Sequence, residues 1–234
     1  MWRRTGRLRF FYNAGMGIFY ATLSPSLAFG ALLVALAVLW RAVLRAPWRR
    51  MQAPTVLSAW CAFIIVLPLL WHFGVPLARG FELHLLGLSL FALMFGPRFA
   101  KIGIALATVA YTVLYDGLWA NLGVNLLLLA ILPAWSSASL LHATQRYLPH
   151  HLFIYLLGNG FFGAMLVVAL TNLAGLATFE LGTLSSPVAD GTVPYLLLLA
   201  FGEAFLTGFM LTILTVYRPE WVMTFDDHMY LHGK

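Results

Sequence analysis

Charged residues are scarce in this chain: of 234 residues, 9% are Asp, Glu, Lys or Arg, whereas 62% are hydrophobic. Soluble domains carry roughly 25% charged and about 45–50% apolar residues. A water-soluble fold of this size cannot hide so much apolar surface, so the composition excludes a soluble globular protein. A bilayer solvates apolar side chains, and we therefore expect an integral membrane protein.

Cysteine and enzyme motifs are nearly or wholly missing. Cys61 is the single cysteine and lies in an apolar run, which excludes a disulfide framework within the chain and argues against a thiolate metal cluster. No zinc-hydrolase motif, phosphate loop, nucleophile elbow or dinucleotide fingerprint occurs. We therefore predict no enzyme activity and no covalently bound cofactor. The net charge of +6 is typical of cytoplasmic loop arginine rather than of nucleic-acid binding.

Apolar runs separated by short polar joints predict an all-α bundle with about seven transmembrane helices. Gly96-Pro97 separates two short runs, and proline there favours a break because it lacks a backbone donor. One broken helix and a re-entrant pair both fit this pattern. The expected spans are residues 23–44, 55–77, 82–97, 100–118, 121–141, 152–176 and 194–217.

Basic residues near the span ends predict the orientation of the bundle. They fall in alternate joints, which places those joints on the cytoplasmic side of a bacterial inner membrane. We therefore expect the N-terminus outside and the C-terminus inside. The bases in question are Arg41, Arg45, Arg49, Arg50, Arg98, Lys101, Arg146, Arg218 and Lys234.

The basic first fifteen residues break this pattern. They are compatible with a targeting-like leader, an interfacial amphipathic arm, or translation that begins at Met16, which we favour. We accordingly divide the chain into an extension (1–15), a transmembrane domain (16–217) and a cytoplasmic tail (218–234).

Glu203 is the clearest ionisable residue at membrane depth, ~13 Å from the start of its span at 1.5 Å per residue. Such a carboxyl group is expected to be protonated, paired or in a polar cavity. It fits either a hydrogen bond between helices or a transport or gating role.

Several polar residues are predicted to gather at the outer end of the bundle. Asn121 and Asn125 share a helix face, Asp116 lies near them, and His84 and Glu82 open the third span. Together they could line one outward-facing polar pocket. Within it His84, with Glu82 and the two asparagines, could bind a metal ion, because imidazole is the commonest metal ligand. The alternative is that the histidine is a packing residue and the asparagines bond between helices. Asp116 is grouped with Glu203 as a buried polar or gating residue.

A second, weaker metal pattern lies in the tail. His228 and His232 are four residues apart beside Asp227, so a helix would present them on one face. The alternative is a solvated tail without a metal.

Three segments resemble the CbiM/NikM family, the substrate-binding membrane components of energy-coupling-factor transporters for cobalt and nickel. His84 to Pro97 resembles a family segment with a histidine and Phe-Gly-Pro at the same distance. Leu122 to Asn125 and Glu203 to Gly208 resemble its Leu-Gly-Ala-Asn and Glu-Gly-Leu-Leu-Thr segments. A proteobacterial branch of the family also shares Ala46 to Arg50, Val216 to Val222 and Thr224 to Asp227.

The resemblance implies a mechanism and partners. In the family, an extracellular N-terminal Met-His and a further histidine bind the metal ion, and His84 aligns with that further histidine. The resemblance therefore implies Co²⁺ or Ni²⁺ as the substrate. ATPase subunits and a transmembrane coupling subunit are the implied partners. This chain departs from the pattern, because Trp2 or Gly17 stands where the second-position histidine would be, and Leu85-Leu86 replaces polar residues.

Three functions follow. The first is a metal-transporter component, and the second is a membrane scaffold or assembly protein that kept the fold and lost the metal site. The third is a membrane enzyme using Glu203 with cytoplasmic histidines, which no nucleophile–base spacing supports.

Overall fold

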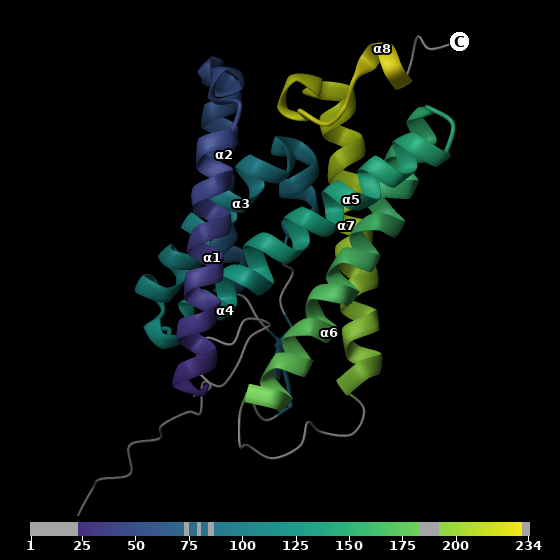
Figure 1. Ribbon diagram of the computed structural model, residues 1–234. Coiled ribbons are helices and arrows are strands. Elements are labelled where there is room, and N and C mark those ends of the chain that lie inside the picture. The colour runs from purple at the N-terminus through teal and green to yellow at the C-terminus, as the bar shows by residue number, and fades with distance from the viewer. Residues whose placement is uncertain (1–22, 73–74, 79–80, 84–86, 183–191, 231–234) are drawn as a thin grey trace, which may run out of the picture.

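The computed structural model describes residues 23–72, 75–78, 81–83, 87–182 and 192–230 (Figure 1). Six helical stretches in this part are long and apolar enough to cross a membrane. The prediction of a polytopic helical bundle is confirmed. Figure 1 places the start of α1 and the C-terminal α8 at opposite ends of the molecule.

The elements in chain order are α1 (Pro25–Arg45), η1 (Trp48–Gln52), α2 (Pro54–His72), β1 (Val75–Ala78), β2 (Phe81–Leu83), α3 (Leu88–Leu114), η2 (Trp119–Asn121), α4 (Leu122–Asn125), η3 (Leu126–Ile131), α5 (Leu132–Tyr147), η4 (Ile154–Gly163), α6 (Ala164–Gly182), α7 (Thr192–Tyr217), η5 (Pro219–Trp221) and α8 (Asp227–Tyr230). The segments η3 and η4 are π-helical. Proline explains the first of these, since Pro133 follows η3 and lacks the N–H of a regular α-helical turn.

A short antiparallel hairpin corrects two predicted boundaries. β1 pairs with β2, with Val75 opposite Leu83. The second span therefore ends at His72 rather than at residue 77, and the third helix begins at Leu88 rather than at residue 82. Both runs are apolar, and apolar content alone does not separate a strand from the end of a helix.

Helix α3 is broken at Gly96, where φ is 76° and ψ is 167°. Glycine adopts this backbone without a Cβ penalty, and Pro97 cannot continue the hydrogen-bond ladder. The break divides α3 into a first leg (88–95) and a second leg (97–114). The first leg has eight residues and is about 12 Å long, so it cannot cross a hydrocarbon core of ~30 Å.

The two legs run in opposite directions beside α2. The Phe63 ring lies 6.0 Å from that of Phe95, whereas a Cβ on Gly87 would lie 3.2 Å from Leu67. The second leg reverses this order, since Trp60 Nε1 bonds Phe99 O at 3.2 Å and the His72 ring stacks on Tyr115 at 4.2 Å.

The third and fourth predicted spans are thus one broken helix folded into a hairpin. A Cβ on Gly103 of the second leg would lie 2.5 Å from the Phe91 ring of the first, which shows how closely the legs pack. Because the chain reverses direction within α3, α1 begins and α8 lies at opposite ends of the described bundle (Figure 1).

Candidate functional site

Glu203, in the middle of α7, is the fully buried carboxyl group among the described residues. It is 0% exposed, and its Oε1 accepts a hydrogen bond from the backbone N–H of Gly87 at 2.5 Å. Gly87 is the N-cap of α3 and has a left-handed φ of 64°. The predicted interhelical hydrogen bond of Glu203 is therefore present, and it joins α7 to the first leg of α3.

The location of this carboxyl group has an electrostatic reason. The first N–H groups of a helix lack intrahelical partners and carry partial positive charge. An acidic group at the N-terminus of α3 therefore satisfies one of these donors inside the bundle. Because the first leg starts within the span, α3 brings a polar helix end to a depth where lipid cannot solvate it.

Asn121 and Asn125 are both buried, at 1% and 0% exposure. They lie on η2 and α4, which pack against α1 so closely that a Cβ on Gly123 would overlap the backbone of Leu32. Glycine between the two asparagines is thus required for the contact with α1. Both asparagine side chains are thus buried, and their role in a metal site stays a prediction.

Asp116 corrects one prediction. Its side chain is exposed in the turn after α3, and its φ is 54°. The prediction that Asp116 is buried is therefore wrong, and a gating role stays a prediction. Aspartate tolerates the left-handed region better than most residues, so the turn explains its presence.

The predicted metal ligand His84 lies outside the described residues. The backbone of Glu82 is in β2, and its side chain also lies outside the described part. The convergence of these two residues with the asparagines therefore stays a prediction. Among the described residues, no group of three or more His, Cys, Asp or Glu side chains could hold a metal ion.

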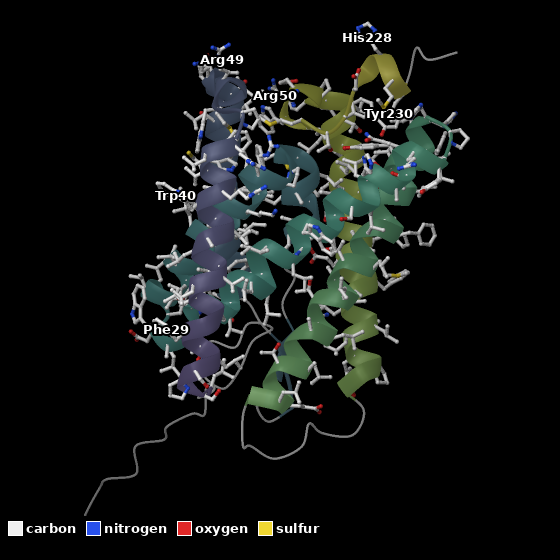
Figure 2. The ribbon with its side chains drawn as sticks, in the orientation of Figure 1. Phe29, Trp40, Arg49, Arg50, His228 and Tyr230 are labelled. Atoms are coloured by element: carbon white, nitrogen blue, oxygen red, sulfur yellow. The ribbon has the colours of Figure 1, made fainter. Side chains whose placement is uncertain are left out.

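The predicted metal face of the tail likewise lies partly outside the described residues and stays a prediction. His232 and the side chain of Asp227 fall outside the described part, and α8 ends at Tyr230. Asp226 caps this short helix, because its Oδ1 accepts the N–H of His228 at 3.0 Å and of Met229 at 3.4 Å. His228 itself is exposed at the end of the molecule (Figure 2).

The tail packs against the broken helix, a contact that sequence reasoning missed. Met223 N donates to Met94 O at 2.6 Å, and Thr224 Oγ1 donates to Leu93 O at 2.5 Å. Both carbonyls belong to the last turn of the first leg, which the break leaves without helical donors. Tyr155 OH lies 2.7 Å from Thr224 Oγ1 and completes the contact.

The tail is therefore part of the bundle. Val222 and Tyr230 are 1% and 7% exposed, and Gln145 Nε2 donates to Tyr230 OH at 3.1 Å. The alternative of a solvated tail is therefore wrong for residues 221–225 and Tyr230, whereas Arg218, Asp226 and His228 are exposed. The aromatic content of this short polar segment is the signal that could have revealed the contact.

Buried amides on α6 and η4 were also missed. Asn159 Oδ1 accepts from Thr144 Oγ1 at 3.0 Å and ties η4 to α5. Asn172 is 4% exposed, and neither its amide nitrogen nor its oxygen bonds another group in the described part of the chain. Polar groups inside a membrane span are costly unless satisfied. Each amide interrupts an apolar run, which is the signal that could have found it.

The fold and these buried polar groups define a polytopic α-helical membrane protein whose third helix is broken and re-enters the bundle. The chain belongs to the CbiM family, described as the cobalt uptake substrate-specific transmembrane region, whose model matches residues 18–221. The family is one of membrane transport components.

Two solved structures have the same fold. A crystal structure of a transition metal transporter superposes with a TM-score of 0.69 and 19% identity, covering 86% of this chain and 92% of that chain. A truncated transition metal transporter gives a TM-score of 0.67 and 19% identity, with 83% and 96% covered. No curated protein sequence matches this chain.

Proposed function

We propose that the chain is the substrate-binding membrane component of an energy-coupling-factor ABC transporter for a divalent transition-metal ion of the cobalt or nickel class. The observation that carries the proposal is the CbiM match over residues 18–221. The broken third helix supports it, because a discontinuous helix brings polar backbone groups to membrane depth, where substrate sites of transporters are built.

In this proposal His84 is the main metal ligand. Glu82, Asn121 and Asn125 complete the site with oxygen donors, which would replace the histidine that is missing near the N-terminus. Nitrogen and oxygen donors in combination suit Co²⁺ and Ni²⁺. Glu203 acts next to this site rather than as a ligand, because it is bonded to Gly87.

The proposed partners follow from the transporter class. ATPase subunits and a transmembrane coupling subunit would supply the energy, and the protein would lie in the bacterial inner membrane with its arginine-rich end in the cytoplasm. Gly160 allows η4 to pack closely against α7, since a Cβ there would lie 2.9 Å from the Leu211 side chain and 3.5 Å from Gly208 Cα.

Metal accumulation in cells tests the proposal. His84→Ala should abolish accumulation of Co²⁺ or Ni²⁺ when the variant is co-expressed with its transporter subunits. His142→Ala is the matched control, because His142 is exposed on α5, and it should leave accumulation unchanged. Wild-type accumulation by His84→Ala would remove the site assignment.

The second candidate is a membrane scaffold or assembly protein that kept the fold and lost the metal site. The Leu85-Leu86 pair and the missing Met-His favour it. Affinity purification from the native membrane separates the two candidates. Recovery of ATPase subunits supports transport, and recovery of another membrane complex without ATPase subunits supports the scaffold.

A further inference from the structure

Five exposed arginines gather at one end of the bundle, where α1 ends, η1 turns and α3 breaks. Figure 2 shows Arg49 and Arg50 at this end and Phe29 near the other end of α1. The cluster consists of Arg41, Arg45, Arg49, Arg50 and Arg98. We call it the arginine cluster.

The elements that carry the cluster contain no acidic residue, and none of its arginines forms an ion pair with a described carboxyl group. The sequence contains no Asp or Glu before Glu82 and none between Glu82 and Asp116. At the same end, Glu220 of η5 pairs with Arg218 at 3.5 Å. The arginine cluster is therefore a region of uncompensated positive charge.

Contacts among η1, α1 and α3 hold the cluster in one arrangement. Trp48 Nε1 donates to Val43 O at 2.9 Å, and the Trp48 ring packs edge-on against Phe99 at 5.3 Å. Arg98 Nη1 donates to Arg45 O at 2.8 Å. The side chains of the cluster are thus displayed from a backbone that the fold has already ordered.

The cluster lies directly beyond a helix face that suits lipid acyl chains. Trp40 and Leu44 are each 66% exposed, and Phe29 is 64% exposed. Trp40 projects sideways from α1, away from the other helices (Figure 2). Tryptophan and arginine at the end of such a face are typical of the headgroup level of a bilayer.

We propose that the arginine cluster binds the phosphate headgroup of an anionic glycerophospholipid. Guanidinium groups match phosphate oxygens in bidentate geometry, and several of them near the membrane surface attract anionic lipid. The lipid-facing side of α1 favours this ligand over an acidic protein, because acyl chains bound along α1 place the headgroup at the arginines. The inference is independent of the transported substrate.

Native mass spectrometry of the full chain in neutral detergent tests the proposal. The probes are dioleoyl-phosphatidylglycerol and dioleoyl-phosphatidylcholine, added at equal concentration. We expect the wild type to retain phosphatidylglycerol preferentially. Arg49→Gln/Arg50→Gln should lower that retention by roughly tenfold or more, since each surface arginine contributes measurably to anionic-lipid affinity.

The matched control is Arg146→Gln/Arg218→Gln, which removes the same formal charge at the same end of the molecule. Its phosphatidylglycerol retention should stay within about threefold of the wild type. Equal losses in both double variants, or no lipid preference in the wild type, would overturn the proposal.

Two further outcomes are decisive. If the double variant does not fold, the single variants Arg49→Gln and Arg50→Gln replace it, and unchanged retention in both would overturn the proposal. Unchanged retention in the double variant, together with loss of a co-purifying protein, would assign the arginine cluster to a protein partner instead and equally overturn it.

Discussion

The backbone nitrogen of Gly87 donates to Oε1 of Glu203 at 2.5 Å, although 116 residues separate the two in the sequence. This hydrogen bond fixes the start of the first leg of α3 against the middle of α7. At its other end, the same leg is held by Met223 and Thr224 of the tail. The C-terminal part of the chain therefore forms hydrogen bonds with both ends of the short first leg.

Removal of the Glu203 carboxyl group should destabilise the bundle. Glu203→Leu leaves the buried N–H of Gly87 without an acceptor, at a cost of about 1–3 kcal/mol. Glu203→Gln keeps an oxygen that can accept this hydrogen bond, so its loss in free energy of unfolding should be less than half that of Glu203→Leu. Thermal unfolding in detergent measures both variants, with Thr171→Val as control, because Thr171 bonds only within α6 to Val167 O in the described contacts. Equal losses for Leu and Gln would contradict the role of the hydrogen bond.

Loss of the contact between the tail and the first leg of α3 should change both hydrogen exchange and the free energy of unfolding. Thr224→Val removes the donor to Leu93 O and the partner of Tyr155 OH, and we expect a loss of about 1–2 kcal/mol. Amide exchange of residues 93–99 should speed up in this variant. The control is Thr212→Val, because Thr212 is exposed on α7 and bonds Gly208 O, and it should leave the exchange of residues 93–99 unchanged. Faster exchange of residues 93–99 in both variants would contradict a specific contact between the tail and the first leg.

The contact between α4 and α1 predicts a difference between two glycines. A Cβ on Gly123 would overlap the Leu32 backbone, whereas a Cβ on Gly30 would have no atom within 4 Å. Gly123→Ala should therefore destabilise by several kcal/mol or prevent folding, because backbone has to move. Gly30→Ala should be neutral or stabilising by up to about 1 kcal/mol, because alanine favours a helix. Thermal unfolding measures the stability of both variants, and similar unfolding temperatures would contradict the close packing of α4 on α1.

Stability should fall at alkaline pH through Tyr230, which lies in the tail. Burial raises the pKa of the Tyr230 hydroxyl group; the hydrogen bond from Gln145 opposes this rise in pKa, and the Asp226 carboxylate adds to it. Because the folded-state pKa lies above the unfolded value of 10.0, the contribution is fully present below about pH 10 and is lost as the pH rises through the folded-state pKa.

Thermal unfolding between pH 8 and pH 11 measures this effect. The decline above pH 10 should be smaller in Tyr230→Phe, which cannot ionise, even though the variant is less stable at pH 8 because it lacks the bond to Gln145. An identical decline in both proteins would show that Tyr230 is not its source.

Much of the fold could be predicted from the sequence, because apolar runs in a membrane protein are long and unambiguous. The apolar run predicts a first span at 23–44, and α1 covers Pro25–Arg45. The break at Gly96-Pro97 was also predicted, since both residues act on the local backbone. The hairpin of β1 and β2 was not, because strand pairing depends on a partner that hydropathy does not reveal.

The polar contacts were harder to predict for a physical reason. The depth of Glu203 follows from counting residues along α7, but its partner is a backbone N–H in a different segment. The same holds for Met223 and Thr224, whose acceptors are carbonyl groups that only the break in α3 makes available. Sequence shows which side chains need a partner, and long-range packing decides which groups supply it.

Direct titration of the purified full-length protein with Co²⁺ and with Ni²⁺ tests the central claim most closely. Isothermal calorimetry should give saturable binding of one ion per chain for the wild type and at least about a tenfold weaker affinity for His84→Ala, since a lost nitrogen ligand costs more than 1.4 kcal/mol. His142→Ala should bind like the wild type. Absence of saturable binding by the wild type, or equal affinity in His84→Ala, would contradict the account.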